Sequence, residues 1–387
     1  MTSKKITKFL IFIVFIIFIS LGLPDSVMGS AWPAIRQTYG FSVDMISIFG
    51  AIQLGFSFCS TLIYPRLSKI WTMDKFIIYS TLLTIIGLAA LGLGHNTFSM
   101  LLSCVFLGFG QGAVDITIND FAAKHFSNSL MNFLHAFYGI GVSLSSFIMT
   151  FAVQPGRTWQ LGVGIIASAQ FLILLLAFIT RDKFNEKAEA THETKEIAPE
   201  KMKFQHFLIP TFYFFYAVEL IIGRFYSSFA VEQLHFSMAV GAAITSFYWA
   251  GLMIGRFLTG FTAYLLSGRT IIFLHFLLLL IGVSFGFVHQ ISFQYLSGTL
   301  LGLGLAPLYP TAMKQAYEKY SANTAKRVIS FNMAFVNVGM FFLPIPLGFL
   351  FEQEGFSSYP FIIAVFALIL AGLSFLIYSK KSWKEFQ

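Results

Sequence analysis

The chain has 387 residues, of which 57% are apolar and only 11% are charged. In soluble domains roughly a quarter of the residues are charged. This composition therefore excludes an ordinary soluble protein and favours one that crosses a membrane many times. The net charge of +8 does not indicate a nucleic-acid partner, because the basic residues follow a membrane pattern along the chain.

The first apolar segment follows Lys4 and Lys5 and resembles a secretory signal. We interpret it as a spanning helix, because Asp25 at its end has a partner in the second half of the chain and further apolar segments follow. Twelve segments of spanning length are predicted, at residues 6–30, 41–65, 75–94, 97–122, 131–153, 158–180, 204–229, 237–264, 270–288, 291–313, 328–350 and 358–379.

Basic residues alternate between the loops that join these segments. All but four of the 25 Lys and Arg residues lie in the N-terminal tail, the even-numbered loops and the C-terminal tail. Arg36 and Arg157 lie in odd-numbered loops, and Arg224 and Arg256 lie within segments. Positive charge stays on the cytoplasmic side, so we expect a multi-pass protein of the plasma or inner membrane with both termini in the cytoplasm.

The chain contains an internal repeat. An offset of 194 residues aligns Asp25 with Glu219 and Gly108 with Gly302, and an offset of 198 aligns Gly141 with Gly339. A charged stretch at 181–203 separates the halves, so we predict a six-helix bundle at 1–180, a cytoplasmic linker at 181–203 and a second bundle at 204–387. Six spans in each half make the repeats parallel, an arrangement of secondary transporters, whereas inverted repeats would require opposite topologies.

Three acids lie inside apolar segments: Asp25, Asp115 and Glu219. A carboxylate in the bilayer costs at least a few kcal/mol, and such residues usually face a cavity and have a function, although a structural role remains open for each of the three. Burial favours the protonated form, as proton coupling requires. Counting residues along the segments places Asp25 in the outer half of the membrane and Asp115 toward the cytoplasm, so the two acids are expected on opposite sides of a cavity.

Other polar and aromatic residues are candidates for solute binding. Amides and carboxylates can each hold two hydrogen bonds to a hydroxyl-rich ligand, and aromatic rings provide stacking faces, although packing or interfacial anchoring is the alternative for each aromatic residue. The candidates are Gln111, Asn119, Asn132, His135, Trp32, Tyr216 and Trp249. Arg256 is expected to be a structural anchor, and Pro307 and Pro310 indicate either a bending gate or close helix packing.

Four stretches resemble the fucose/galactose/glucose–proton symporter branch of the major facilitator superfamily: 110–119 (GQGAVDITIN), 131–141 (MNFLHAFYGIG), 249–260 and 302–310 (GLGLAPLYP). The resemblance implies an all-α membrane fold of twelve helices in two parallel six-helix repeats. It also implies that an acid in the first helix and one in the fourth, here Asp25 and Asp115, serve protonation and sugar recognition, with Asn132 at the sugar site.

Two departures from the family pattern stand out. The loop at 65–75 has lost most of the superfamily's Gly-x-x-x-Asp-Arg-x-Gly motif, which puts the usual cytoplasmic gating contacts of this half in doubt. Ser145 and Ser146 follow Gly141 where similar proteins often carry Gly-Pro, and this difference also argues against the drug-antiporter branch.

The sequence contains no phosphate-binding loop, metal-ligand cluster or nucleophile–base arrangement, so we expect neither an enzyme nor a cofactor. The function indicated is proton-coupled uptake of a sugar or similar small polar solute by alternating access, in a monomer whose partners are its solute, protons and the lipid bilayer. Two alternatives stay open: proton-antiport export of drugs or metabolites, and transport of a lipid or cell-envelope intermediate.

Overall fold

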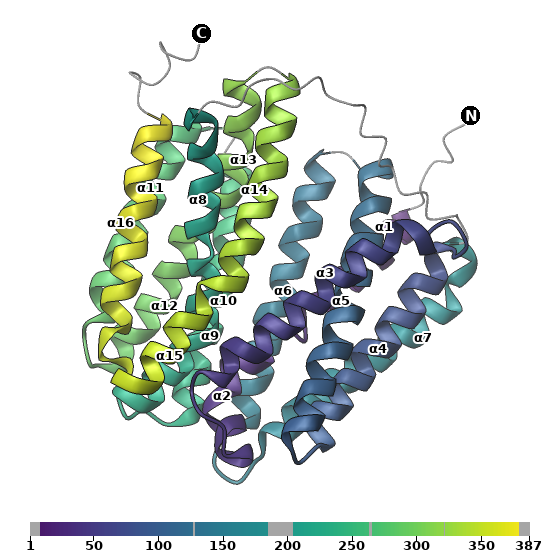
Figure 1. Ribbon diagram of the computed structural model, residues 1–387, viewed down its shortest axis with the longest axis horizontal. Helices are drawn as coiled ribbons and strands as arrows, with labels where there is room; N and C mark the ends of the chain where they lie inside the picture. The colour runs from purple at the N-terminus through teal and green to yellow at the C-terminus, as the bar shows by residue number, and fades with distance from the viewer. Residues whose placement is uncertain (1–7, 127, 185–203, 263–264, 321, 379–387) are drawn as a thin grey trace. The chain divides into compact units, whose positions relative to one another are not determined.

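The computed structural model describes residues 8–126, 128–184, 204–262, 265–320 and 322–378. The chain divides into two compact units, Met1–His192 and Glu193–Gln387 (Figure 1). Twelve helices in the described residues are long and apolar enough to cross a membrane, which confirms the predicted number. The predicted linker lies at the division between the units, and its residues 185–203 are outside the described part of the chain.

The first unit contains a broken helix followed by five long ones. The broken span consists of α1 (Lys8–Gly22) and α2 (Val27–Tyr39). The other spans are α3 (Met45–Leu67), α4 (Met73–Leu93), α5 (Thr97–His125), α6 (Asn128–Ala152) and α7 (Trp159–Ile179), with a short 3₁₀ turn η1 (Arg181–Lys183) after them.

The second unit has more interruptions. After the 3₁₀ turn η2 (Phe204–Phe207) its elements are α8 (Leu208–Tyr216), α9 (Val218–Ser228), the π-helical turn η3 (Phe229–Gln233), α10 (Met238–Thr262), α11 (Gly268–Gly286), α12 (Ile291–Leu305), α13 (Leu308–Lys319), α14 (Ala322–Phe342), α15 (Pro344–Glu354), the 3₁₀ turn η4 (Phe356–Ser358) and α16 (Tyr359–Tyr378).

Local sequence explains several helix ends. Asn96 and Ser99 form a capping box that starts α5, since each side chain binds the other residue's backbone N–H. Ser267 caps α11 by accepting from the backbone N–H of Thr270. Gly40 ends α2 with a φ of 70°, a left-handed conformation that favours glycine.

The broken helices occur at matching places in the two units. Residues 23–26 form a turn between α1 and α2, and Ala217 interrupts the helix between α8 and α9. These two spans are also the most buried of the twelve, with 67% and 61% of their most apolar stretch buried. The repeat therefore places Asp25 and Glu219 at a helix break inside the most enclosed span of each unit.

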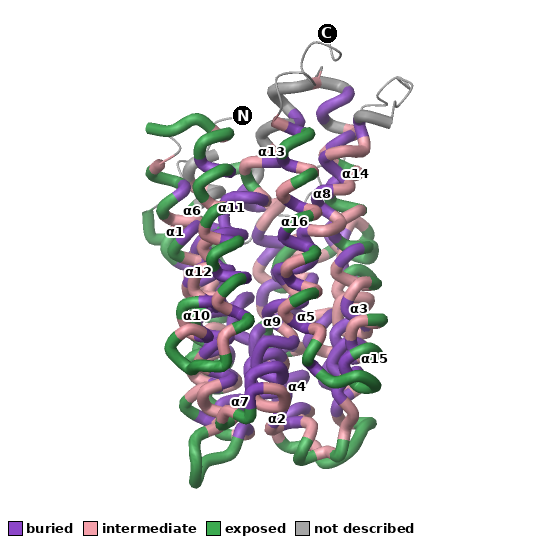
Figure 2. The backbone as a smooth tube through the Cα atoms, turned by 90° about the vertical axis from the view of Figure 1, so that its left-hand side faces the viewer, coloured by how far each residue is buried: buried purple, intermediate pink, exposed green. Residues whose placement is uncertain are grey.

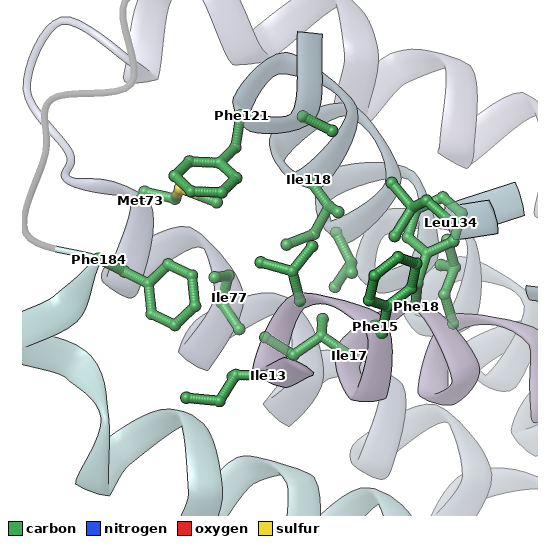
Figure 3. Packing of buried hydrophobic residues seen from close by; sticks show 14 of the residues in the cluster. Ile13, Phe15, Ile17, Phe18, Met73, Ile77, Ile118, Phe121, Leu134 and Phe184 are labelled. Atoms are coloured by element: carbon green, nitrogen blue, oxygen red, sulfur yellow. The ribbon is translucent and has the colours of Figure 1, made fainter. Parts of the chain in front are cut away.

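An apolar cluster fixes α1 within the first unit (Figure 3). Phe15 and Phe18 lie beside Leu134 of α6, while Ile13 and Ile77 lie near Phe184. The rings of Phe15 and Phe137 approach to 4.6 Å between centroids. This packing holds the end of α1, and with it the turn that carries Asp25, against α5 and α6.

Glycines allow the closest helix contacts, and they do so at repeated positions. A Cβ atom at Gly141 would lie 2.0 Å from the carbonyl oxygen of Ile19, and one at Gly339 would lie 2.3 Å from that of Phe214. Gly141 and Gly339 are aligned by the sequence repeat, so α6 crosses α1 in the same way as α14 crosses α8. The repeat in sequence is thus a repeat of backbone packing.

Replacing Gly141 by alanine is expected to destabilise the protein. The added methyl group meets a backbone carbonyl that cannot move aside, and overpacking of this kind costs about 1–3 kcal/mol. The measurement is the melting temperature of the purified protein in detergent, with Gly164→Ala as the matched control, because a Cβ at Gly164 meets nothing within 4 Å. Equal melting temperatures for the two variants would show that the crossing is not this close.

Large apolar side chains cover the outward faces of the spanning helices. In Figure 2 buried and exposed positions alternate along these helices. Phe273 of α11 is 68% exposed and Phe375 of α16 is 70% exposed. Exposed aromatic side chains at such density suit contact with lipid rather than water.

Candidate functional site

Asp25 lies in the turn that interrupts the first span. Pro24 precedes it and has no backbone N–H, which favours the end of α1 at this point. The hydroxyl of Ser26 donates to the carbonyl oxygen of Val142 at 2.9 Å, so the turn is tied to α6. The Asp25 side chain is exposed rather than buried.

A chain of side-chain hydrogen bonds ends on Asp25. Gln111 of α5 donates from Nε2 to Asp25 Oδ1, and Tyr138 of α6 donates its hydroxyl to Asp25 Oδ2. Gln53 of α3 donates from Nε2 to Gln111 Oε1 at 2.6 Å. Gln111 Nε2 also lies 3.4 Å from the carbonyl oxygen of Leu21. Asp25 therefore joins the helix break to α3, α5 and α6.

Asp115 lies one helical turn after Gln111 on the same face of α5, which corresponds to about 6 Å along the helix. Asn119 donates from Nδ2 to Asp115 Oδ1 at 2.8 Å and to its backbone oxygen at 2.9 Å. The Asp115 side chain is exposed, and its carboxyl group interacts electrostatically with that of Asp25. The two acids form one cluster.

This clustering corrects the prediction that Asp25 and Asp115 lie on opposite sides of a cavity. The first span was expected to end at residue 30, which placed Asp25 in its outer half. The span extends instead from Lys8 to Tyr39, because α2 continues it past the break. Asp25 consequently lies near the middle of the span, beside the face of α5 that carries Gln111 and Asp115.

The remaining candidates of the first unit have different surroundings. His135 is exposed on α6 and its ring lies edge-on to Phe18, 5.5 Å between centroids. Trp32 is fully buried against Phe41 and Phe49, 6.2 Å from each ring, and its indole N–H has no partner in the described structure. Asn132 lies on α6, but its side chain is outside the described part.

The second unit holds its acid in an ion pair. Arg256 of α10 donates from one guanidinium nitrogen to both oxygens of Glu219, at 3.1 and 3.3 Å. Tyr248 donates its hydroxyl to the backbone oxygen of Glu219 at 2.8 Å, and Tyr216 donates to that of Leu305 at 3.2 Å. Glu219 and Asp25 thus occupy matching positions with different partners, a cation in one unit and neutral donors in the other.

Trp249 and two prolines complete the candidates of the second unit. The Trp249 ring packs against Gly223, one turn after Glu219, and its indole N–H has no partner among the described residues. Pro307 lies at the interruption between α12 and α13, and Pro310 lies in the first turn of α13. The fourth span of the first unit, α5, has no such interruption.

Sequence reasoning missed three residues that shape the two clusters: Gln53, Tyr138 and Tyr248. Tyr138 follows His135 by three residues on α6, so the polar face that included Asn132 and His135 pointed to it. Gln53 was detectable as an amide inside an apolar segment. Tyr248 had no signal, because a tyrosine beside Trp249 in a spanning helix resembles ordinary packing.

A further polar contact joins the ends of α3 and α5. The hydroxyl of Tyr64 donates to Asp120 Oδ2 at 3.0 Å, and Lys124 Nζ lies 3.0 Å from the same oxygen. These residues lie next to the loop that lacks most of the superfamily motif. Through Asp120 they join the end of α3 to the end of α5.

Two six-helix units, each with an ionisable residue at a break in its most buried span, define a multi-pass membrane transporter. The model of the Major Facilitator Superfamily matches residues 10–263 and 214–385. The chain belongs to this superfamily.

Two curated proteins show how far the similarity in sequence extends. The glucose/mannose transporter GlcP of Bacillus subtilis (strain 168) is 23% identical over 376 residues, which cover 92% of each chain. Bypass of stop codon protein 6 of Saccharomyces cerevisiae (strain ATCC 204508 / S288c) is 23% identical over 286 residues, covering 66% of this chain and 57% of that protein.

Solved structures share the fold at low identity. The D-xylose-proton symporter superposes with a TM-score of 0.73 at 11% identity and covers 95% of this chain and 96% of its own. The nucleoside transporter NupG gives 0.72 at 12% identity, covering 94% and 98%. A peptide transporter POT gives 0.71 at 14% identity, covering 97% and 95%. These structures share the fold but are named for different solutes, so they do not identify the solute of this protein.

Proposed function

We propose that the protein imports a sugar or a similar small polyhydroxylated solute together with protons, by alternating access. The observation that carries this proposal is the cluster of two neighbouring carboxylates, Asp25 and Asp115, bound by amide and hydroxyl donors inside a spanning unit. Two carboxylates that interact with each other favour sharing a proton, since their like charges repel.

The same cluster suits a solute rich in hydroxyl groups. Carboxylate oxygens accept hydrogen bonds, and the amides of Gln111 and Asn119 both donate and accept. Asp115 and His135 have exposed side chains, so a solute reaches them without any change in the unit. The name of the curated relative from B. subtilis, a glucose/mannose transporter, supports a sugar as the solute.

The other candidate contacts stay predictions. Trp249 presents an indole N–H without a described partner, which suits a solute hydroxyl, and Tyr216 lies beside Glu219. Trp32 and Asn132 remain predicted contacts, although Trp32 is buried among phenylalanines in this structure. Glu219 remains a predicted coupling residue, and it lies in an ion pair with Arg256.

The membrane orientation and the gate belong to the same proposal. The distribution of Lys and Arg supports cytoplasmic termini in the plasma or inner membrane. That the protein acts as a monomer stays a prediction. Pro307 lies at the interruption between α12 and α13, and Pro310 follows three residues later in the first turn of α13. These two prolines support bending of this span during alternating access.

A thermal-shift screen tests the solute class. A ligand that binds the folded state raises the melting temperature as its concentration passes the dissociation constant. We expect glucose or mannose to stabilise the purified protein in detergent, with nucleosides, dipeptides and a lipid-like amphiphile compared in parallel. Stabilisation by the amphiphile alone would favour the lipid or cell-envelope alternative. Uptake rather than release of the stabilising sugar under an inward proton gradient separates symport from antiport.

A further inference from the structure

We propose that His275 of α11 is a positioning residue for the break between α12 and α13, because it supplies to the carbonyl oxygen of Leu303 the hydrogen bond that Pro307 removes. The bond holds the bent form of this span. Its part in transport rests on the bending that the proposed function assigns to the span, whereas the bond itself is testable without any solute.

Pro307 leaves a carbonyl oxygen without its helical donor. In an α-helix each carbonyl accepts from the N–H four residues later, and proline has no N–H, so the oxygen of Leu303 loses this bond. The bilayer core has no water to replace the lost donor, so another group of the protein has to supply one. His275 lies on the neighbouring helix α11, and its Nδ1 is 2.6 Å from the Leu303 oxygen.

The acceptor fixes the direction of this hydrogen bond. A carbonyl oxygen only accepts, so Nδ1 carries the proton and His275 is the donor. The histidine is partly buried within the second unit. Ionisable side chains inside spanning helices commonly pair with backbone carbonyls, and the carbonyl that Pro307 frees accounts for a histidine at this place.

The half of the span before the break is packed against its neighbours through backbone contacts. A Cβ atom at Gly302 would lie 2.1 Å from the carbonyl oxygen of Tyr248 on α10, and one at Gly304 would lie 2.7 Å from the Cα atom of Leu279 on α11. Leu279 lies one helical turn after His275, so the glycine contact and the hydrogen bond are neighbours on α11. These contacts leave α12 little room to move relative to α10 and α11.

Side-chain hydrogen bonds tie both edges of the break to α8. Tyr216 donates its hydroxyl to the carbonyl oxygen of Leu305 at 3.2 Å, and Tyr213 donates to that of Tyr309 at 2.5 Å. A side-chain donor can release its acceptor by rotating about its own bonds, whereas the glycine contacts of α12 are rigid. The flexible point of the span is therefore the break, and side chains of α8 and α11 control it.

The first unit lacks both parts of this arrangement. The repeat offset of 194 residues aligns Pro307 with Ala113, and α5 continues through Ala113 without interruption. The matching glycine contacts of α4 with α5 and of α11 with α12 place Ser80 at the position of His275, and Ser80 donates its hydroxyl to a carbonyl of its own helix. The proline and the histidine depart from the repeat together, as expected if the second compensates for the first.

A double-mutant cycle, followed by the melting temperature of the purified protein in detergent, tests the bond. His275→Leu leaves the Leu303 oxygen without a donor, and we expect the melting temperature to fall by about 2–4 °C. Pro307→Ala restores the backbone N–H, so the same leucine substitution should cost almost nothing in the Pro307→Ala background. A histidine that only fills space would cost the same in both backgrounds, and this result would overturn the proposal.

Two further variants separate hydrogen bonding from packing. His275→Asn places an amide N–H close to the position of Nδ1, so it should restore most of the lost melting temperature. His289→Leu makes the same change as His275→Leu at an exposed histidine after α11, and this control should melt close to wild type. A His275→Asn protein as unstable as His275→Leu would contradict the role of a donor.

Exchange of labelled glucose across proteoliposomes, at equal concentrations on both sides, tests the part in transport. We expect His275→Leu to slow exchange by roughly fivefold, the factor that corresponds to one hydrogen bond, and His275→Asn to restore the rate. Stabilisation of the protein by glucose should be unchanged, because the substitution alters the bend and none of the proposed solute contacts. An unchanged exchange rate in His275→Leu would overturn the role in transport. Wild-type protein that exchanges neither glucose nor mannose would contradict the proposed function instead, while the melting cycle still reports the bond.

Discussion

Replacement of Asp115 by asparagine is expected to abolish accumulation of sugar by proteoliposomes under an inward proton gradient. For one proton per solute, a gradient of one pH unit supplies about 1.4 kcal/mol, which sustains roughly tenfold accumulation. Asparagine is permanently neutral and cannot carry a proton, so the inside and outside concentrations should become equal. Exchange of sugar across the membrane should continue, because the amide still binds hydroxyl groups.

The control for this variant is Asp182→Asn. Asp182 has the same side chain, is 88% exposed and lies outside the spanning helices, so accumulation should remain as in wild type. Undiminished accumulation by Asp115→Asn would remove Asp115 from proton coupling, and loss of exchange together with accumulation would indicate damaged binding or folding instead.

Replacement of Arg256 by glutamine is expected to destabilise the second unit strongly. Glu219 is only 11% exposed in its side chain and Arg256 is 21% exposed, so the change leaves a largely buried carboxylate without its cation. Removing one partner of a buried ion pair costs about 3–5 kcal/mol. The measurement is the melting temperature in detergent, together with the amount of folded protein recovered from membranes.

The double variant Glu219→Gln with Arg256→Gln distinguishes the ion pair from simple loss of the arginine. It removes the uncompensated charge, so it should be more stable than Arg256→Gln alone. Arg269→Gln, at an exposed arginine, is the matched control and should melt close to wild type. A double variant as unstable as Arg256→Gln would contradict a dominant role for the pair.

The fold was predictable because its signals are long-range and redundant. Twelve apolar segments, alternating basic loops and a repeat offset of 194 residues each indicate the same arrangement. The repeated glycines have a structural role, because Gly141 and Gly339 each lie where one helix packs closely against a backbone carbonyl group of another. Helix breaks were harder to predict, since Ala217 has no helix-breaking chemistry and its interruption depends on packing.

The site was predictable by residue type but not by partner. A carboxylate in an apolar segment is rare enough to identify Asp25, Asp115 and Glu219 individually. Their partners come from other helices, and which side chain reaches them depends on helix rotation and crossing. The sequence could not reveal that Arg256 pairs with Glu219, because 37 residues separate the two. Nor could it place Tyr138 on Asp25, which required the close crossing of α1 and α6.

The most direct test of proton-coupled sugar import is the pH of a weakly buffered medium around proteoliposomes when sugar is added without an imposed proton gradient. We predict that the external medium becomes more alkaline on addition of glucose or mannose, because protons enter with the sugar, and that Asp115→Asn gives no such signal. Acidification of the medium, or sugar uptake by the wild type with no change in pH, would contradict symport.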